Sequence, residues 1–150
     1  MPDEWIEDVF KACEAAPWHR YLFLTKNIHG YEDFDIVHKN NYWYGQTWDC
    51  VKSTLTNYNY YERQFNQFLS IEPLQSDNIP FDSIKKGWFD WVIVGAETGN
   101  RKGKIIPKRE WIENIVNACR EAKIPVFLKK NLADAGVWGK KELIQEYPWR

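Results

Sequence analysis

The amino-acid sequence predicts an α/β fold with five parallel β-strands. Short apolar runs recur five times along the chain, and each has the length and composition of a strand buried on both faces of a sheet. Helical segments or long connections separate these runs, as the crossovers between parallel strands require. An open sheet and an arc of a (β/α) barrel both satisfy this pattern. The chain of 150 residues suits a single domain, residues 1–150, and is shorter than a complete barrel of about 250 residues.

The first half of the chain predicts one helix and two strands. Residues 3–16 carry apolar side chains at helical spacing. Residues 21–25 form a continuous apolar run and predict the first strand, and residues 42–46 predict the second. Residues 28–40 are polar and irregular, whereas residues 55–67 show a weak helical pattern.

The second half predicts three strands and the clearest helix. The strands are residues 68–71, 91–94 and 125–128, and residues 91–94 are the best defined of them. The stretch from residue 75 to residue 87 carries a proline, Pro80, and predicts a loop. A helix opens at Pro107, because one apolar stripe follows it, formed by Trp111, Ile112, Ile115, Val116 and Cys119.

Composition excludes several classes of protein. The net charge of −1 produces no overall field that would draw the chain to nucleic acid or anionic lipid. No segment has the apolar length of a membrane span, and the first residues do not form a signal peptide, which predicts a cytoplasmic protein. The three cysteines are scattered without a C-x-x-C motif, and the three histidines lack ligand spacing, so we expect free thiols and no metal site.

Polar residues follow all five predicted strands. In both candidate architectures, ligands bind beyond the carboxyl ends of the strands, which meet at one edge of the sheet. Strand ends are also polar simply because they meet water, but two carboxylates and two ammonium groups at one edge would suit a zwitterion. We therefore interpret these residues as a ligand site: Lys26, Gln46, Glu72, Glu97 and Lys129.

A glycine-rich basic loop follows the fourth predicted strand. It has three residues, not four, between Gly99 and the Gly-Lys pair, so it is not a P-loop. Its glycines are four apart, so it is not a dinucleotide-binding fingerprint either. What remains is a cationic segment, residues 101–104, beside Glu97. Such a segment suits an anionic or nucleotide-like ligand or a nucleic-acid backbone, and a solvated surface loop is the plain alternative.

Four motifs together, "FLTKN", "FLSIEPL", "DWVIVGAETGNRKGK" and "VFLKKN", resemble a known family. It is the phage-associated family called phage protein Gp thirty-seven/Gp sixty-eight, a domain of unknown function with radical-SAM-like character. The resemblance covers roughly residues 2–131 and implies a partial TIM-barrel-like (β/α) arc. It carries over to eight residues of this chain: Lys26, Glu72, Pro73, Gly95, Glu97, Thr98, Gly99 and Lys129.

The same resemblance implies which cofactors the family uses. Its members carry an amino-terminal Cys-rich motif, proposed to ligate an iron–sulfur cluster for S-adenosylmethionine chemistry. This sequence contains no such motif, so the resemblance implies an amino-terminally truncated member without a cluster of its own. S-adenosylmethionine and the cluster are thus implied for the full-length family only. Enzymatic activity would require a separate cluster-bearing fragment.

We therefore expect a protein that binds a small polar or nucleotide-like ligand at the strand carboxyl ends. The alternatives are a non-enzymatic nucleic-acid-associated module using residues 101–104, or a decayed gene remnant. The apolar edge strand, residues 21–25, predicts a homo-oligomer or an amino-terminal partner fragment. No catalytic residue is identified, and the candidate ligand-binding residues are Lys26, Gln46, Glu72, Glu97, Thr98, Arg101 and Lys129.

Overall fold

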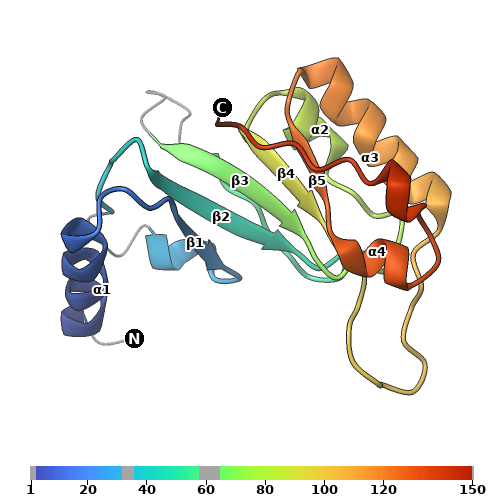
Figure 1. The fold of residues 1–150 in the computed structure, drawn as a ribbon, viewed down its shortest axis with the longest axis horizontal. Helices are drawn as coiled ribbons and strands as arrows, with labels where there is room; N and C mark the ends of the chain where they lie inside the picture. The colour runs from blue at the N-terminus through green and yellow to red at the C-terminus, as the bar shows by residue number, and fades with distance from the viewer. Residues whose placement is uncertain (1–2, 32–35, 58–64, 150) are drawn as a thin grey trace.

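A computed structural model of the chain describes residues 3–31, 36–57 and 65–149. It confirms the α/β fold: the five strands lie in one sheet in the order β1-β2-β3-β4-β5, and each pair of neighbours is parallel (Figure 1). The strands are β1 (Tyr21–Thr25), β2 (Tyr42–Trp48), β3 (Asn66–Ile71), β4 (Trp91–Val94) and β5 (Val126–Leu128).

Helices connect or flank these strands, as parallel pairing requires. Two of them are long, and the rest are single turns at the ends of loops. The α-helices are α1 (Asp3–Ala15), α2 (Phe81–Lys85), α3 (Arg109–Ala122) and α4 (Lys130–Asp134), and the 3-10 helices are η1 (Ile28–Tyr31) and η2 (Lys140–Glu142).

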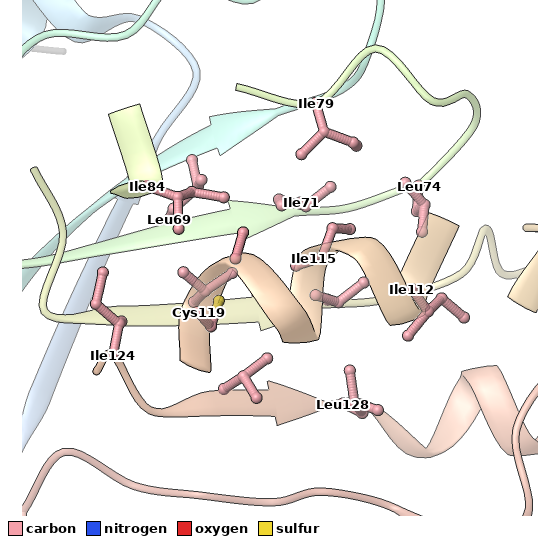
Figure 2. Packing of buried hydrophobic residues seen from close by; sticks show 14 of the residues in the cluster. Leu69, Ile71, Leu74, Ile79, Ile84, Ile112, Ile115, Cys119, Ile124 and Leu128 are labelled. Atoms are coloured by element: carbon pink, nitrogen blue, oxygen red, sulfur yellow. The ribbon is translucent and has the colours of Figure 1, made fainter. Parts of the chain in front are cut away.

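The main core lies between one face of the sheet and the helices α2, α3 and α4. Alternate residues of β3, β4 and β5 point to this face, and they are almost fully buried. Ile112, Ile115 and Cys119 of α3 belong to the same buried cluster as Leu69 and Ile71 of β3 (Figure 2). This contact explains why the predicted apolar stripe forms a helix, since each fully buried Ile contributes about 1.5–3 kcal/mol.

On the same face of the sheet, α1 packs against β1 and β2 through aromatic residues. Cys13 of α1 is buried together with Tyr42 and Tyr44 of β2. The Phe10 ring lies 5.4 Å from the ring of Phe23 in β1, centroid to centroid. All four α-helices of the described residues contribute buried side chains to this face of the sheet. The opposite face is covered by other side chains.

The opposite face carries an aromatic cluster, which we define as Trp43, Phe68, Trp91, Phe127 and Trp149. Its rings meet mostly edge to face, with centroids 5.2–6.3 Å apart, a favourable arrangement for aromatic pairs. Gly45 of β2 is required here, because the Phe68 ring occupies the space of a side chain at position 45.

The two outer edges of the sheet differ. The edge of β5 is covered by the carboxyl-terminal segment, which we define as residues 143–149. There the backbone N–H of Leu128 donates to Ile144 (2.8 Å) and that of Glu146 donates to Val126 (3.1 Å). The indole N–H of Trp91 adds a bond to the Glu146 carbonyl (2.9 Å). Among the described residues, β1 pairs with β2 alone, so its outer edge has no strand beside it.

Several details differ from the expectations drawn from the sequence. The second strand does not end at Gln46 but continues to Trp48. The stretch 75–87, predicted to be a loop, contains α2. The weak helical pattern of residues 55–67 predicted a helix, and this prediction is wrong for the described residues. Residues 55–57 are not helical, and residues 66–67 begin β3. Residues 58–64 lie outside the described residues. None of the helices in the described ranges is long and apolar enough to cross a membrane.

Candidate functional site

The carboxyl ends of β3, β4 and β5 bring three residues together. Glu72, Gly95 and Lys129 each come directly after the last residue of a strand. The backbone ladder continues through them, because the N–H of Gly95 donates to Ile71 (3.1 Å) and that of Lys129 donates to Val94 (2.9 Å). Since side chains alternate along a strand, Glu72 and Lys129 point to the face opposite the main core.

Glu72 and Lys129 form an ion pair at this edge. The Lys129 ammonium group donates to the Glu72 carboxylate, and the Asn131 amide lies 3.5 Å from the other carboxylate oxygen. Both charged side chains remain accessible, with 25% of the Glu72 side chain and 41% of the Lys129 side chain exposed. The pair is therefore partly exposed to solvent.

Asn131 is held in place by the backbone of the loop after β4. Its Oδ1 accepts from the N–H of Ala96 (3.1 Å), and its Nδ2 donates to the carbonyl of Ala96 (2.8 Å). This two-bond clamp fixes the side-chain amide and joins the start of α4 to β4. The orientation of Asn131 toward Glu72 is thus set by the fold.

Gly95 makes the contact between Glu72 and Lys129 sterically possible. A Cβ atom at position 95 would lie 2.6 Å from Oε1 of Glu72 and 3.1 Å from Cδ of Lys129. Both distances are shorter than ordinary van der Waals contact. Glu72 and Lys129 come from strands that are not neighbours, and they meet across β4 because position 95 has no side chain.

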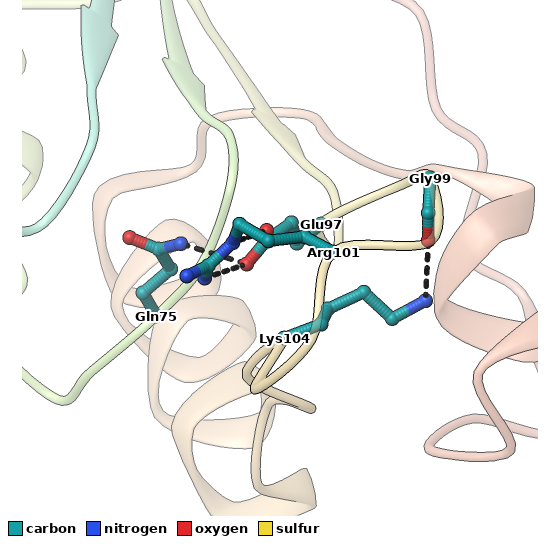
Figure 3. A network of polar contacts seen from close by, with 5 residues as sticks. All are labelled: Gln75, Glu97, Gly99, Arg101 and Lys104. Carbon is teal, nitrogen blue, oxygen red and sulfur yellow. Dashed lines mark hydrogen bonds and ion pairs between the residues drawn. The ribbon is translucent and has the colours of Figure 1, made fainter.

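A second polar cluster lies in the loop after β4. The Arg101 guanidinium donates two bonds to the Glu97 carboxylate, of 2.6 and 2.9 Å, and Nε2 of Gln75 donates a third of 2.9 Å (Figure 3). Lys104 donates to the Gly99 carbonyl at 3.4 Å. We call Gln75, Glu97 and Arg101 the loop latch, because they join this loop to the segment that follows β3.

The loop latch changes the chemistry of Glu97. The hydrogen bonds from Arg101, and secondarily the one from Gln75, lower the pKa of Glu97 from 4.5 to about 2. Only 12% of the Glu97 side chain is exposed, against 57% for Arg101. Glu97 is consequently an ionised carboxylate whose two oxygens already accept hydrogen bonds from the protein.

Gln46 does not lie at the end of its strand. It is buried within β2, and its amide closes two bonds with the backbone of Thr56: Nε2 donates to the carbonyl (2.6 Å), and Oε1 accepts from the N–H (2.9 Å). The side chain therefore holds the segment after β2 against the sheet. The sequence suggests a strand end at Gln46 because this polar residue follows an apolar run, whereas β2 continues to Trp48.

The carboxylate that follows β2 belongs to Asp49. It accepts from the Ser53 hydroxyl (2.8 Å) and from the N–H groups of Val51 and Lys52. These bonds, led by that of Ser53, lower the pKa of Asp49, and the charge of Lys26 makes a smaller contribution. Lys26, after β1, thus lies close enough to Asp49 to act on it electrostatically.

Five of the seven predicted residues fall into three groups. Glu72 and Lys129 are in direct contact, Glu97 and Arg101 form the loop latch, and Lys26 lies beside the β2 end. Thr98 is exposed in the loop after β4. Asn131, Gln75 and Asp49 also contribute polar contacts at these strand ends, although the sequence does not indicate them. The motif "VFLKKN" contains Asn131, but nothing in its spacing indicates that the amide turns back to Ala96.

The thiols do not suit an iron–sulfur cluster. Cys13, Cys50 and Cys119 are buried and free, and they lie on α1, after β2 and on α3. Burial raises the pKa of Cys13, and it raises that of Cys119 to about 12, whereas a cluster requires thiolates. In residues 3–31, 36–57 and 65–149, no three His, Cys, Asp or Glu side chains are arranged to hold a metal ion.

A family model described as "Protein of unknown function (DUF5131)" matches residues 1–147. No curated protein matches the chain, and no solved structure matches it either.

Proposed function

Because the chain belongs to the DUF5131 family, a family of unknown function, we propose a function from its own residues: the carboxyl edge of the sheet binds a small polar or nucleotide-like ligand. The observation that carries this proposal is the Glu72–Lys129 pair above Gly95. A carboxylate and an ammonium group, both partly exposed and next to a fixed amide, form a site with complementary charges.

A ligand with two opposite charges would replace the internal ion pair. Its ammonium or hydroxyl groups would donate to Glu72, and its carboxylate or phosphate oxygens would accept from Lys129. Asn131 offers an amide whose orientation is set by Ala96. The exchange is favourable when the ligand makes more hydrogen bonds to the two charges than they make to each other.

Glu97 and Arg101 have a positioning role in this proposal. They satisfy each other's hydrogen bonds, and with Gln75 they hold the loop that carries Thr98 and Gly99 near the end of β4. Removing the latch would release this loop and weaken binding indirectly.

The resemblance to the radical-SAM-like phage family extends the proposal to a ligand class. Five consecutive parallel strands, with all four described α-helices on one face, fit an arc of such a barrel. The methionine end of S-adenosylmethionine carries one ammonium group and one carboxylate, which match Glu72 and Lys129. The cysteines do not fit a cluster, so the proposal for this chain is ligand binding without a radical step.

Nucleic-acid binding through residues 101–104 is the second candidate. Its support is a loop that extends away from the sheet and carries the exposed residues Lys102 and Lys104 (Figure 1). The Arg101 guanidinium is already occupied by Glu97, which leaves fewer cations for phosphate. Binding of this kind weakens steeply as salt rises.

Isothermal titration with S-adenosylmethionine, methionine and adenosine monophosphate tests the proposal. Glu72→Gln and Lys129→Met should each weaken binding by roughly tenfold or more, because each removes a charge-assisted bond. Lys130→Met is the matched control, since its side chain is 76% exposed and pairs only loosely with Asp134 (3.7 Å). Equal effects of Lys129→Met and Lys130→Met, or no binding of any probe, would contradict the proposal.

A second titration with single-stranded DNA separates the two candidates. Nucleic-acid binding would depend on salt and be reduced by Lys102→Gln and Lys104→Gln. Binding at the strand ends should be insensitive to these two changes.

A further inference from the structure

Two hydroxyl side chains lie side by side on the sheet, one row below the Glu72–Lys129 pair. Thr47 of β2 and Ser70 of β3 are direct neighbours in the parallel register. Ser70 comes two residues before Glu72 on the same strand, so both side chains point to the face opposite the main core, about 7 Å apart along the strand. One small ligand can therefore reach the hydroxyls and the ion pair together.

Both residues are almost fully buried, yet their hydroxyl groups have no partner. The exposed fraction is 6% for Thr47 and 3% for Ser70. Within the part of the chain that the structure describes, neither hydroxyl takes part in a hydrogen bond. The fully enclosed side-chain atoms without a partner belong instead to Tyr42 and Gln67, so the two hydroxyls keep a narrow access to solvent. Buried polar groups in native proteins are usually bonded, and this hydroxyl pair is available to a ligand.

The neighbouring side chains do not supply the missing bonds. Ile93 of β4 lies beside Ser70 in the register and carries no polar group. In the row above, the Glu72 carboxylate already accepts from Lys129 and faces the Asn131 amide. The hydroxyl pair is thus an unused donor set next to the candidate site.

The charges around the hydroxyl pair cancel. Lys26 after β1 acts electrostatically on Asp49 after β2, and Lys129 after β5 pairs with Glu72 after β3. Two positive and two negative groups offer no excess of positive charge to a phosphate group, which carries roughly two negative charges at neutral pH. A ligand that is itself neutral overall, with one charge of each sign, suits this arrangement better.

We propose that the ligand of the carboxyl edge is a zwitterionic α-amino acid, whose carboxylate accepts from the hydroxyls of Thr47 and Ser70 and whose ammonium group donates to Glu72. This inference rests on the proposed function and narrows its ligand class from small polar or nucleotide-like molecules to amino acids. Lys129 exchanges Glu72 for the ligand carboxylate. Bonds from the hydroxyls and the ammonium group to a carboxylate are charge-assisted, which offsets the loss of the internal pair.

The backbone at Gly95 leaves room for such a ligand. The space above position 95 is now filled by the ends of the Glu72 and Lys129 side chains, which lie within 2.6–3.1 Å of where a Cβ would stand. When the ion pair opens, this space becomes available to the α-carbon of the amino acid. A larger residue at position 95 would occupy it.

Thermal-shift measurements on the intact chain test the ligand class. The probes are the standard α-amino acids and the nucleoside monophosphates. At least one amino acid should raise the unfolding temperature, and the nucleoside monophosphates should not. The amino acid with the largest effect is then titrated by calorimetry beside the amine that lacks only its carboxylate.

Two variants test the role of the hydroxyls. Ser70→Ala and Thr47→Val should each weaken binding of that amino acid by about tenfold, because each removes a bond to a charged group. Both should leave the affinity for the amine unchanged. Since the hydroxyls have no partner in the protein, both variants should also unfold at the same urea concentration as the unchanged protein. Ser83→Ala, in α2 on the other side of the sheet, is the matched control and should change neither quantity.

The outcomes separate this inference from the proposed function. Amino-acid binding that Glu72→Gln weakens but Ser70→Ala and Thr47→Val leave unchanged would overturn this inference alone. Tighter binding of a nucleoside monophosphate than of every amino acid would also overturn it and leave the proposed function standing. If none of the probes bound, both would be wrong.

Discussion

The ammonium group of Lys129 and the carboxylate of Glu72 meet across β4, although their strands, β5 and β3, are not neighbours. The contact depends on the missing side chain at Gly95, where a Cβ would lie 2.6 Å from a Glu72 oxygen. A single glycine thus decides whether the two charges of the candidate site can pair.

Gly95→Ala should separate Glu72 from Lys129 at a modest cost in stability. The added methyl group meets the flexible ends of two side chains, which can move away. We expect a decrease of less than about 1 kcal/mol in the free energy of unfolding, measured by urea denaturation, below the usual cost of overpacking. Ligand binding at Glu72 should nevertheless weaken.

Gly45→Ala provides the contrast. Its methyl group meets the buried Phe68 ring, which is enclosed by the aromatic cluster, so we expect a loss of about 1–3 kcal/mol. Gly30→Ala is the control: its nearest neighbour is Asn27 at 3.8 Å, an ordinary contact. If Gly45→Ala proved as mild as Gly30→Ala, the packing described for the aromatic cluster would be wrong.

Gln46→Leu should destabilise the protein without acting on the candidate site. The substitution removes both bonds to the Thr56 backbone in a buried place, which should cost about 1–3 kcal/mol of unfolding free energy. Thr98→Ala, in an exposed loop, should change stability by less than about 0.5 kcal/mol. Ligand titration of Gln46→Leu below its unfolding midpoint should match the unchanged protein.

The loop latch should respond to acid. The pKa of Glu97 is lowered in the folded state, so its contribution to stability is present above pH 4.5 and is lost as the pH falls toward about 2. Arg101→Gln should raise this pKa toward 4.5 and reduce that part of the pH dependence. Carbon-13 NMR titration of the Glu97 carboxyl measures it directly, and Lys102→Gln should leave the titration unchanged.

The carboxyl-terminal segment should loosen when Glu146 loses its charge. Its carboxylate accepts from Arg120 (2.8 Å) and from the N–H of Val126 (3.1 Å), and the Arg120 bond is the main cause of its lowered pKa. Glu146→Gln should cost about 1 kcal/mol of unfolding free energy, since the pair with Arg120 is partly exposed. Glu121→Gln, in the exposed pair with Lys85, should cost less.

Protonation of Glu146 at acidic pH should lower the free energy of unfolding, as the Glu146→Gln substitution does. Its stabilising contribution is present above the unfolded pKa of 4.5 and is lost as the pH falls through the lower folded value. Urea titrations at several pH values would contradict this account if Glu146→Gln and the unchanged protein lost stability in parallel between neutral and acidic pH.

The apolar pattern of the sequence was sufficient for the bounds of β1 and β4 and for the existence of α3. Residues 91–94 were predicted as a strand and form β4 with the same bounds, and the stripe after Pro107 forms α3. By contrast, α2 spans five residues, too few to show helical periodicity, and Pro80 before it suggested a loop. The end of β2 was misplaced because polar Gln46 looks like a strand terminus although it is buried.

The predicted positions of the strand ends indicated which charged residues would lie near one another, but not which of them would form ion pairs. Glu72 and Lys129 could be assigned to one edge from parallel topology alone. Their direct contact depends on the register of three strands and on the space at Gly95. Neither the register nor this space can be read from the spacing of residues along the chain. The same is true of Asn131, whose amide is fixed by Ala96, a residue distant in sequence.

The aromatic cluster gives this protein an optical signature of its own. The indoles of Trp43, Trp91 and Trp149 lie with ring centroids 5.2–6.3 Å apart, close enough for their electronic transitions to couple. Such coupling gives a paired positive and negative band in the far-ultraviolet circular dichroism spectrum, where the strongest indole transition lies. Trp149 belongs to the carboxyl-terminal segment, so this paired band would report whether that segment is docked, without any attached dye.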